Sequence, residues 1–164
     1  MRILGIDPGS RVTGYGVIDS NGVTSRHVTS GCIRTENEDF SARLGEIFHG
    51  IQNIVRAEMP DEVAVEQVFM ARNPSSALKL GHARGAVVTA VVTLDLAIAE
   101  YSPRAVKKAL VGTGAAEKEQ VQHMIRLLLG VKGKMGLDES DALAVALCHA
   151  HSSVNHLKIR GAAG

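Results

Sequence analysis

The hydrophobic periodicity of this chain changes at about residue 39, from strand-like segments to helical spacing. Before that point three strand-like segments follow one another at 2–7, 12–19 and roughly 23–33, separated by Pro8-Gly9-Ser10 and by Asn21-Gly22. Asn-Gly is a strong signal for a two-residue β-hairpin turn. The first 33 residues therefore predict an antiparallel three-stranded meander.

After residue 39 helices and strands alternate. Helices are expected at 39–59, 75–93, from 102–103 to the Gly-rich break at 112–114, at 117–129 and from 138, with strands at 62–66 and 96–101. This order predicts an α/β fold with a mixed five-stranded sheet flanked by helices on both faces. It is the layout of a ribonuclease H-like fold, although element order alone also allows other α/β arrangements. We expect one domain over 1–153 and a flexible tail over 154–164, because the last residues lack a periodic apolar face.

Two of the apolar strands end in a carboxylate. Asp7 closes the first strand and Glu66 closes the strand at 62–66. Ligand sites of α/β sheets lie outside strand ends, so these two side chains could converge there. Each could instead cap a loop or pair with an arginine such as Arg11 or Arg72, and that explanation suits either one taken alone.

A second pair of carboxylates opens the last helix. Asp138 and Asp141 are three residues apart, which places both on one face of the first turn. Capping and the helix dipole explain one such residue better than two. Four carboxylates suit hard cations such as Mg²⁺, for which Mn²⁺ may substitute, and without a cation their repulsion would raise at least one pKa. The set matches two-metal phosphodiester hydrolysis, with two ions in each active site.

Basic residues concentrate in the middle of the chain. Residues 72–134 carry ten Lys and Arg against four Asp and Glu, whereas residues 1–71 carry six against ten. The segment is either an ordinary solvated surface or a phosphate-binding flank beside an acidic centre. Phosphate contact is the more economical joint explanation for the basic residues of this segment, among them Arg72, Lys79, Lys107 and Lys118.

Several classes of protein are excluded. The chain has no Gly-Lys-Ser/Thr phosphate loop of a P-loop ATPase and no HxxxH pattern of a zinc enzyme, so we expect His149 and His151 to be packed or solvated. No segment has the length and apolarity of a membrane span, and no signal peptide is evident, which predicts a cytoplasmic protein. Cys32 and Cys148 are expected to be reduced thiols.

Two further features leave alternatives open. Phe69, in the loop after Glu66, could stack on an unpaired base or could plug the core together with its apolar neighbours. Gly81 and Gly85 lie on one helix face, where glycine is unfavourable unless another element approaches closely. That element could be the chain's own sheet or a second protomer.

Five blocks of sequence resemble the RuvC family of bacterial Holliday-junction resolvases. They follow in the family's order and together span nearly the whole chain, from Gly5–Val17 through Glu66–Ala71, Ser76–Gly81 and Ala116–His123 to Asp138–Ala144. The opening Gly-Ile-Asp-Pro-Gly would be unspecific alone, since sugar-kinase and actin-type ATPases begin similarly. The five blocks together are far more specific.

The resemblance implies a ribonuclease H-like fold, a homodimer, and Mg²⁺-dependent paired incision of two like-polarity strands at a four-way DNA junction. On the matching positions, the metal ligands and catalytic residues would be Asp7, Glu66, Asp138 and Asp141. Phe69 would stack at the junction point, and Lys107 and Lys118 would contact the phosphates near the cut. The resemblance also implies partnership with the branch-migration complex of RuvA and RuvB type, and a cleavage preference for short sequences at the crossover.

Three alternatives remain open at this point. A YqgF-type RNA-processing nuclease shares the fold and a similar first strand, but the Phe69 block and the pair Lys107 and Lys118 argue against it. An actin-like ATPase or sugar kinase needs two such domains, and 164 residues provide one. A catalytically silent junction-binding module would bind the junction without cutting it.

Overall fold

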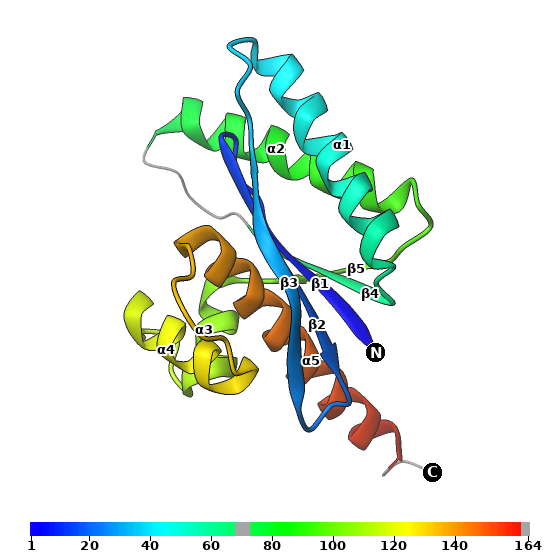
Figure 1. The fold of residues 1–164 in the computed structure, drawn as a ribbon, viewed down its shortest axis with the longest axis vertical. Helices are drawn as coiled ribbons and strands as arrows, with labels where there is room; N and C mark the ends of the chain where they lie inside the picture. Colours follow the sequence, from blue (N-terminus) through cyan, green and yellow to red (C-terminus); the bar gives the residue numbers. More distant parts are fainter. Residues whose placement is uncertain (68–72, 162–164) are drawn as a thin grey trace.

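The computed structural model describes residues 1–67 and 73–161, with side chains to residue 153. Its five-stranded sheet has the order β3-β2-β1-β4-β5 (Figure 1). The first three strands form the expected antiparallel meander, whereas β4 pairs parallel with β1 and β5 parallel with β4. The strands are β1 (Arg2–Asp7), β2 (Val12–Ser20), β3 (Ser25–Arg34), β4 (Glu62–Glu66) and β5 (Ile98–Tyr101).

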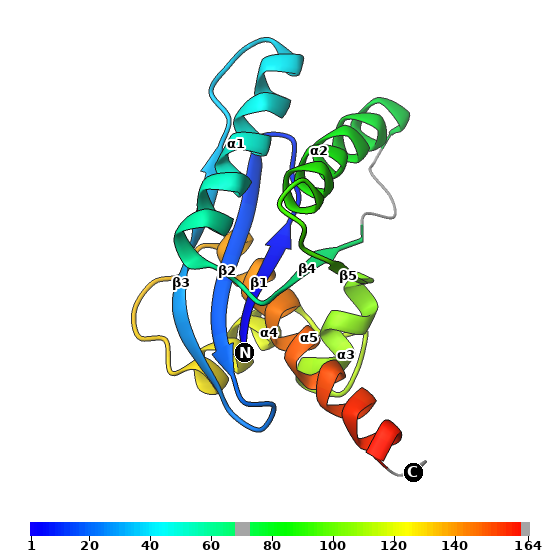
Figure 2. The ribbon, with the colours of Figure 1, turned by 90° about the vertical axis from the view of Figure 1, so that its right-hand side faces the viewer.

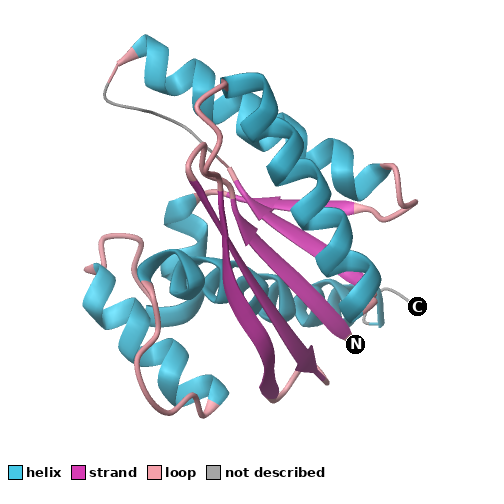
Figure 3. Cartoon of the chain, turned by 45° about the horizontal axis from the view of Figure 1, so that its top comes forward, coloured by secondary structure: helices cyan, strands magenta, loops and turns pink. Residues whose placement is uncertain are grey.

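Helices cover both faces of this twisted sheet, as Figures 2 and 3 show. One face packs against α1 (Phe40–Glu58) and α2 (Pro74–Val92), through a core that includes Leu4, Ile6 and Val17. The other face packs against α3 (Pro103–Val111), α4 (Lys118–Leu129) and α5 (Leu137–Gly161). The predicted mixed five-stranded sheet with helices on both faces is confirmed.

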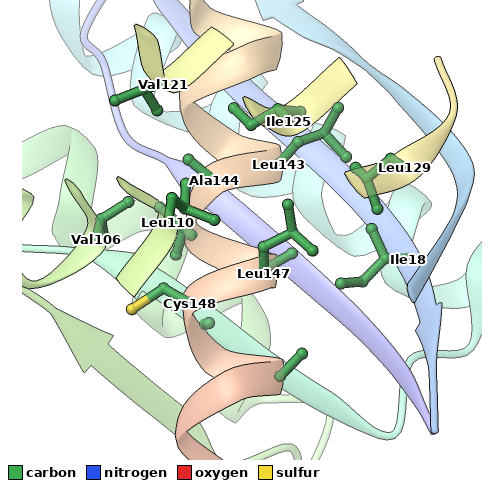
Figure 4. Close-up of a cluster of buried hydrophobic side chains, with 14 of the residues drawn as sticks. Ile18, Val106, Leu110, Val121, Ile125, Leu129, Leu143, Ala144, Leu147 and Cys148 are labelled. Atoms are coloured by element: carbon green, nitrogen blue, oxygen red, sulfur yellow. The ribbon is translucent and has the colours of Figure 1, made fainter. Parts of the chain in front are cut away.

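The helix α5 lies at the centre of the second core. Figure 4 shows its Leu143, Ala144 and Leu147 between side chains of α3, α4 and β2. Residues 142–147 are all buried, which explains why this helix has almost no polar stripe. A helix enclosed by three neighbouring elements has little freedom to shift, so it holds its first turn in a fixed place.

Glycines in β1 and β2 allow α5 to lie directly on the sheet. Gly5 pairs with Gly16, and Asp7 pairs with Gly14, so these residues share the face that α5 covers. A Cβ added at Gly5 would lie 2.2 Å from the carbonyl oxygen of Ala142, a backbone atom of α5. A Cβ added at Gly14 or Gly16 would also meet α5, at the Asp138 carbonyl oxygen and the Leu143 side chain.

The hairpin between β2 and β3 differs from the prediction. Its connection spans the four residues 21–24 rather than two. The side-chain oxygen of Asn21 accepts hydrogen bonds from the backbone N–H groups of Val23 (2.9 Å) and Thr24 (2.8 Å). The two-residue turn was wrong because the asparagine side chain closes a wider loop by itself.

The last helix passes the expected domain boundary. Residue 153 lies inside α5, which continues to Gly161, so no helix end marks a boundary there. Flexibility of residues 154–164 stays a prediction. Among the helices described, none combines the length and apolarity that crossing a membrane requires.

Candidate functional site

Asp7 and Glu66 lie side by side on the face of the sheet that α5 covers. Each ends its strand, and the parallel register that pairs Ile6 with Val65 brings the two following residues together. Side chains alternate along a strand, so Asp7 points to the same side as Gly5, toward α5. The convergence expected from two acidic strand ends is observed.

The first turn of α5 brings the other two carboxylates to this place. A Cβ at Gly14 would lie 2.0 Å from the carbonyl oxygen of Asp138, so the helix begins in direct contact with β2. The charges of Asp138 and Asp141 both act on Asp7 and raise its pKa. The first turn of α5 therefore brings both carboxylates near enough to the end of β1 to act on Asp7.

Glu139, between these two aspartates, is a residue that sequence reasoning missed. Its carboxylate accepts a hydrogen bond from the Ser30 hydroxyl on β3 and another from the backbone N–H of Gly136 at 3.1 Å. It thereby ties the first turn of α5 to the sheet. Its position three residues after Gly136 was a visible signal for the local hydrogen bond. The contact with Ser30 joins residues 109 positions apart, so no local pattern in the sequence indicated it.

The acidic pair has strongly shifted pKa values. Burial, and then the charge of Asp141, raise the pKa of Asp7 to about 6. Burial, and then the charge of Asp7, raise the pKa of Glu66 to about 8. The two carboxyl groups lie within hydrogen-bonding reach of each other, and their contact raises the pKa of Glu66 further. Two buried carboxylates in contact cannot both ionise without a nearby cation.

Lys118 supplies one positive charge to the site. The capping box of Glu117 and Gln120 fixes the start of α4, where Lys118 is the first residue. Its Nζ donates a hydrogen bond to Oδ2 of Asp141 at 3.1 Å, which raises the pKa of the lysine. The site thus holds an ammonium group against one carboxylate, beside two carboxyl groups with raised pKa values.

These groups open onto a hollow of about 270 Å³. Polar side chains from four elements line it, above an apolar floor formed by α3, α4 and α5. The lining residues are Glu66, Pro103, Val106, Lys107, Lys118, Val121, Asp141 and Ala144. A hollow with cations and carboxylates on facing walls suits an anionic ligand that arrives with a metal ion.

The carboxylates do not form a ready-made cage. Among the described residues no three His, Cys, Asp or Glu side chains lie close enough together to ligate one ion as they stand. Neither Asp7 nor Glu66 has an ion pair with an arginine or lysine in the part of the chain that the structure describes. The donor chemistry nevertheless fits a divalent ion. The carboxylates repel one another, and Lys118 offsets only part of their negative charge, so a cation bound by their oxygens would relieve the repulsion.

Of the other predicted site residues, only some lie at the hollow. Lys107 lines the hollow, whereas Lys79 is exposed on α2 and does not. Phe69 and Arg72 lie outside the described residues. Asp138 begins α5 beside β2 but is absent from the lining of the hollow.

The histidine and cysteine predictions are confirmed. His149 is 7% exposed and takes part in hydrogen bonds with Tyr101 and Glu62, so it is packed. His151 is half-buried. Cys32 and Cys148 are free thiols, and burial raises the pKa of Cys148 to about 11.

Several known proteins are similar to this chain over most of its length. Residues 3–149 match the sequence model of a family described as crossover junction endodeoxyribonuclease RuvC. The crossover junction endodeoxyribonuclease RuvC of Acinetobacter baylyi is 56% identical over 151 residues, covering 92% of this chain and 83% of the relative. That of Marinobacter nauticus is 52% identical over 162 residues, covering 99% and 93%.

A solved structure is similar over nearly the same length. The structure of T. thermophilus RuvC in complex with Holliday junction substrate superposes with a TM-score of 0.89 and 35% sequence identity. The match covers 95% of this chain and 96% of that one. The ribonuclease H-like fold expected from the order of elements is confirmed by this likeness.

Proposed function

This chain belongs to the family of RuvC crossover junction endodeoxyribonucleases, and on that basis we propose that it resolves four-way (Holliday) DNA junctions by paired incisions in recombination and repair. The observation that carries the proposal is a hollow lined by Glu66, Asp141, Lys107 and Lys118, with Asp7 in contact with Glu66 beside it. The relatives are named as DNA junction nucleases, so the RNA-processing alternative is not favoured.

Metal ions are the cofactor of this proposed reaction, and we assign Asp7, Glu66, Asp138 and Asp141 as their ligands. Mg²⁺ is the proposed ion, with two in each site and Mn²⁺ as a substitute, because all four donors are carboxylates. When bound, the metal supplies charge stabilisation at the reacting phosphate and an activated water. These four residues are then the catalytic set.

The protein's own groups have separate tasks. A bound cation would favour the ionised form of Asp7 and Glu66, whose pKa values burial and mutual repulsion raise toward neutral pH without metal. Lys118, released from Asp141, can turn toward a phosphate in the same hollow. Lys107 faces that hollow from α3 and fixes the strand through a second positive charge.

Mg²⁺ is expected to stabilise the protein most at high pH. The raised pKa values of Asp7 and Glu66 mean that, between about pH 4 and 8, the folded metal-free protein binds more protons than the unfolded chain. Its free energy of unfolding therefore falls as the pH rises through this window, and Mg²⁺ restores it near pH 8 and above. Thermal melting with EDTA or Mg²⁺ at matched ionic strength measures both effects.

The matched control for this experiment is the double variant Asp7→Asn, Glu66→Gln. It keeps the size of both side chains but removes their titration, so its metal-free profile should be flatter than that of the wild type. A wild-type profile that rises from pH 5 to pH 8 in EDTA, or that matches the double variant, would contradict the assignment.

DNA contacts outside the hollow extend the proposal. We place Phe69 at the junction point as a stacking residue and Arg72 and Lys79 on DNA phosphates. Lys79 is exposed on α2, which suits such a contact. The partners proposed beyond DNA are a branch-migration complex of RuvA and RuvB type, and the cytoplasm is the proposed location because it follows from the DNA substrate.

The homodimer implied by the family has a candidate face on α2. Leu78 is 66% and Val92 49% exposed. On the same stripe, a Cβ added at Gly81 or Gly85 would have no atom of the described residues within 4 Å. The chain's own sheet is therefore excluded as the element that approaches these glycines. The spacing 78, 81, 85 and 92 is that of a helix–helix seam, and we propose that a second copy covers it.

Substituting both glycines with alanine is expected to weaken the dimer at least tenfold. The exchange favours the isolated helix by about 1 kcal/mol per residue, so the monomer stays folded while the added methyl groups separate the two helices. Sedimentation equilibrium gives the dissociation constant. Gly45→Ala in α1, where an added Cβ also meets nothing, is the matched control and should leave that constant unchanged.

A cleavage assay tests the function itself. The purified chain with Mg²⁺ is offered a synthetic four-way DNA junction, a linear duplex of the same sequence and a structured RNA. We expect symmetric cuts in two strands of like polarity on the four-way junction, and little cutting of the duplex. Preference for RNA would overturn the proposal, and junction binding without any cutting would favour a silent binding module.

A further inference from the structure

We propose that a second hollow, beside the carboxylate site, binds a backbone phosphate of the DNA strand through Arg104 and Lys107. The inference rests on the proposed function, because it takes DNA as the ligand. The hollow measures about 560 Å³, and its lining residues are Pro103, Arg104, Lys107, Thr113, Gly114 and Ala115. They come from the start of α3 and from the loop between α3 and α4.

This second hollow adjoins the first. Pro103 and Lys107 line both, so the two spaces meet at the first two turns of α3. A strand whose phosphate lies against Lys118 and the carboxylates therefore passes directly over Lys107 and reaches Arg104. The adjoining hollow is the place for a neighbouring phosphate of the same strand.

The charge of the second hollow suits that ligand. Arg104 and Lys107 are both cationic, and its lining contains no acidic side chain. The Thr113 hydroxyl oxygen accepts a hydrogen bond from the backbone N–H of Ala115 at 3.3 Å, and its own hydrogen can be donated to a ligand. The first hollow, by contrast, also contains Glu66 and Asp141, whose negative charge opposes an anion in the absence of a metal.

Arg104 is held in place by a glycine. A Cβ added at Gly114 would lie 2.4 Å from Cγ and 3.2 Å from Nε of Arg104, so the arginine stem lies across this residue. The backbone does not require glycine there, because Gly114 is not among the residues with positive φ, unlike Gly112 in the same loop. The missing side chain serves the arginine, and Gly114 acts as a positioning residue for its guanidinium.

Salt-dependent binding tests this proposal. A fluorescent four-way junction is titrated in EDTA, which prevents cutting, over a range of salt concentrations. Arg104→Gln keeps a stem of similar shape but loses the charge. The negative slope of log K against log salt should therefore decrease in magnitude, by about 0.9 for each phosphate that the variant no longer neutralises. Gly114→Ala keeps the charge but displaces the arginine stem, and should also decrease the magnitude of this slope.

Two controls make the result specific. Lys108→Gln removes the same charge from an exposed position on the same helix that lines neither hollow, and should leave the slope unchanged. The double variant Arg104→Gln, Gly114→Ala should bind no more weakly than Arg104→Gln alone, because the glycine acts only through the arginine. Matching melting temperatures show that each variant is folded.

The outcomes separate this inference from the proposed function. A wild-type protein that fails to bind the four-way junction contradicts the function. A wild type that binds, with Arg104→Gln or Gly114→Ala showing the wild-type slope, overturns the inference alone. Equal decreases in the magnitude of the slope for Arg104→Gln and Lys108→Gln also overturn it. Such a result would show that the overall charge of the protein, rather than a local site, determines binding.

Discussion

Asp7→Asn is expected to lower the rate of junction cleavage by at least about a thousandfold, or some 4 kcal/mol of activation free energy, and to leave junction binding intact. The substitution keeps the size of the side chain but removes the charge that faces Glu66, Asp138 and Asp141. A site that binds a divalent ion through these carboxylate oxygens then lacks its central ligand. Lys107 and Lys118 still face the hollow, so the DNA still binds.

The same variant should be more stable than the wild type without metal. Asp7 is buried and repelled by two neighbouring carboxylates, and asparagine removes both costs. Higher stability together with the loss of cleavage separates a missing ligand from a damaged fold. Thermal melting in EDTA and single-turnover cleavage with Mg²⁺ measure the two effects.

Asp95→Asn is the matched control for Asp7→Asn. Asp95 is exposed and has a left-handed backbone (φ 60°), which asparagine adopts readily, so the same chemical change should leave cleavage and stability unaltered. Cleavage by Asp7→Asn at the wild-type rate would show that the metal-site assignment is wrong.

Gly5→Ala is expected to destabilise the fold by about 3 kcal/mol or more and to abolish most cleavage. The added methyl group would lie 2.2 Å from the carbonyl oxygen of Ala142 and 2.6 Å from the backbone nitrogen of Ala146. Both are backbone atoms of a buried helix, so α5 must move away from β1. That movement also withdraws Asp138 and Asp141 from Asp7.

Urea unfolding at fixed protein concentration measures this destabilisation. Gly45→Ala, in the middle of α1 with open space around the added Cβ, should instead stabilise the protein by roughly 0.5–1 kcal/mol. Opposite signs for the same chemical change would show that the contact with α5, rather than backbone entropy, decides the result. Equal stability of Gly5→Ala and wild type would contradict the close packing of α5 on β1.

Much of the fold and the outline of the site could be predicted because both depend on local patterns. Asp7 and Glu66 end apolar strands, and the ends of neighbouring parallel strands must meet at one edge of the sheet. The spacing of Asp138 and Asp141 fixes their shared helix face whatever the helix packs against. Such residues carry their geometry within a few positions of the sequence.

Features that depend on distant partners could not be predicted. Lys118 meets Asp141 only because α4 folds back beside α5, and the Ser30 hydroxyl meets Glu139 across the sheet. The glycines of α2 carried a signal for close approach, but only the structure shows that the chain's own sheet leaves them open. The hairpin prediction failed for a local reason, since the Asn21 side chain competed with the backbone turn.

The contact between α5 and the glycines of β1 and β2 also determines when the enzyme can become active during its synthesis. Asp7 lies on β1 and Asp141 on α5, so the ribosome makes Asp7 well before Asp141. The nascent chain can pair β1, β2 and β3 early, but it has no complete set of carboxylates until α5 emerges and docks. Cutting activity therefore requires that α5 has docked on β1 and β2, and a chain that has paired only its first three strands lacks the assembled carboxylates.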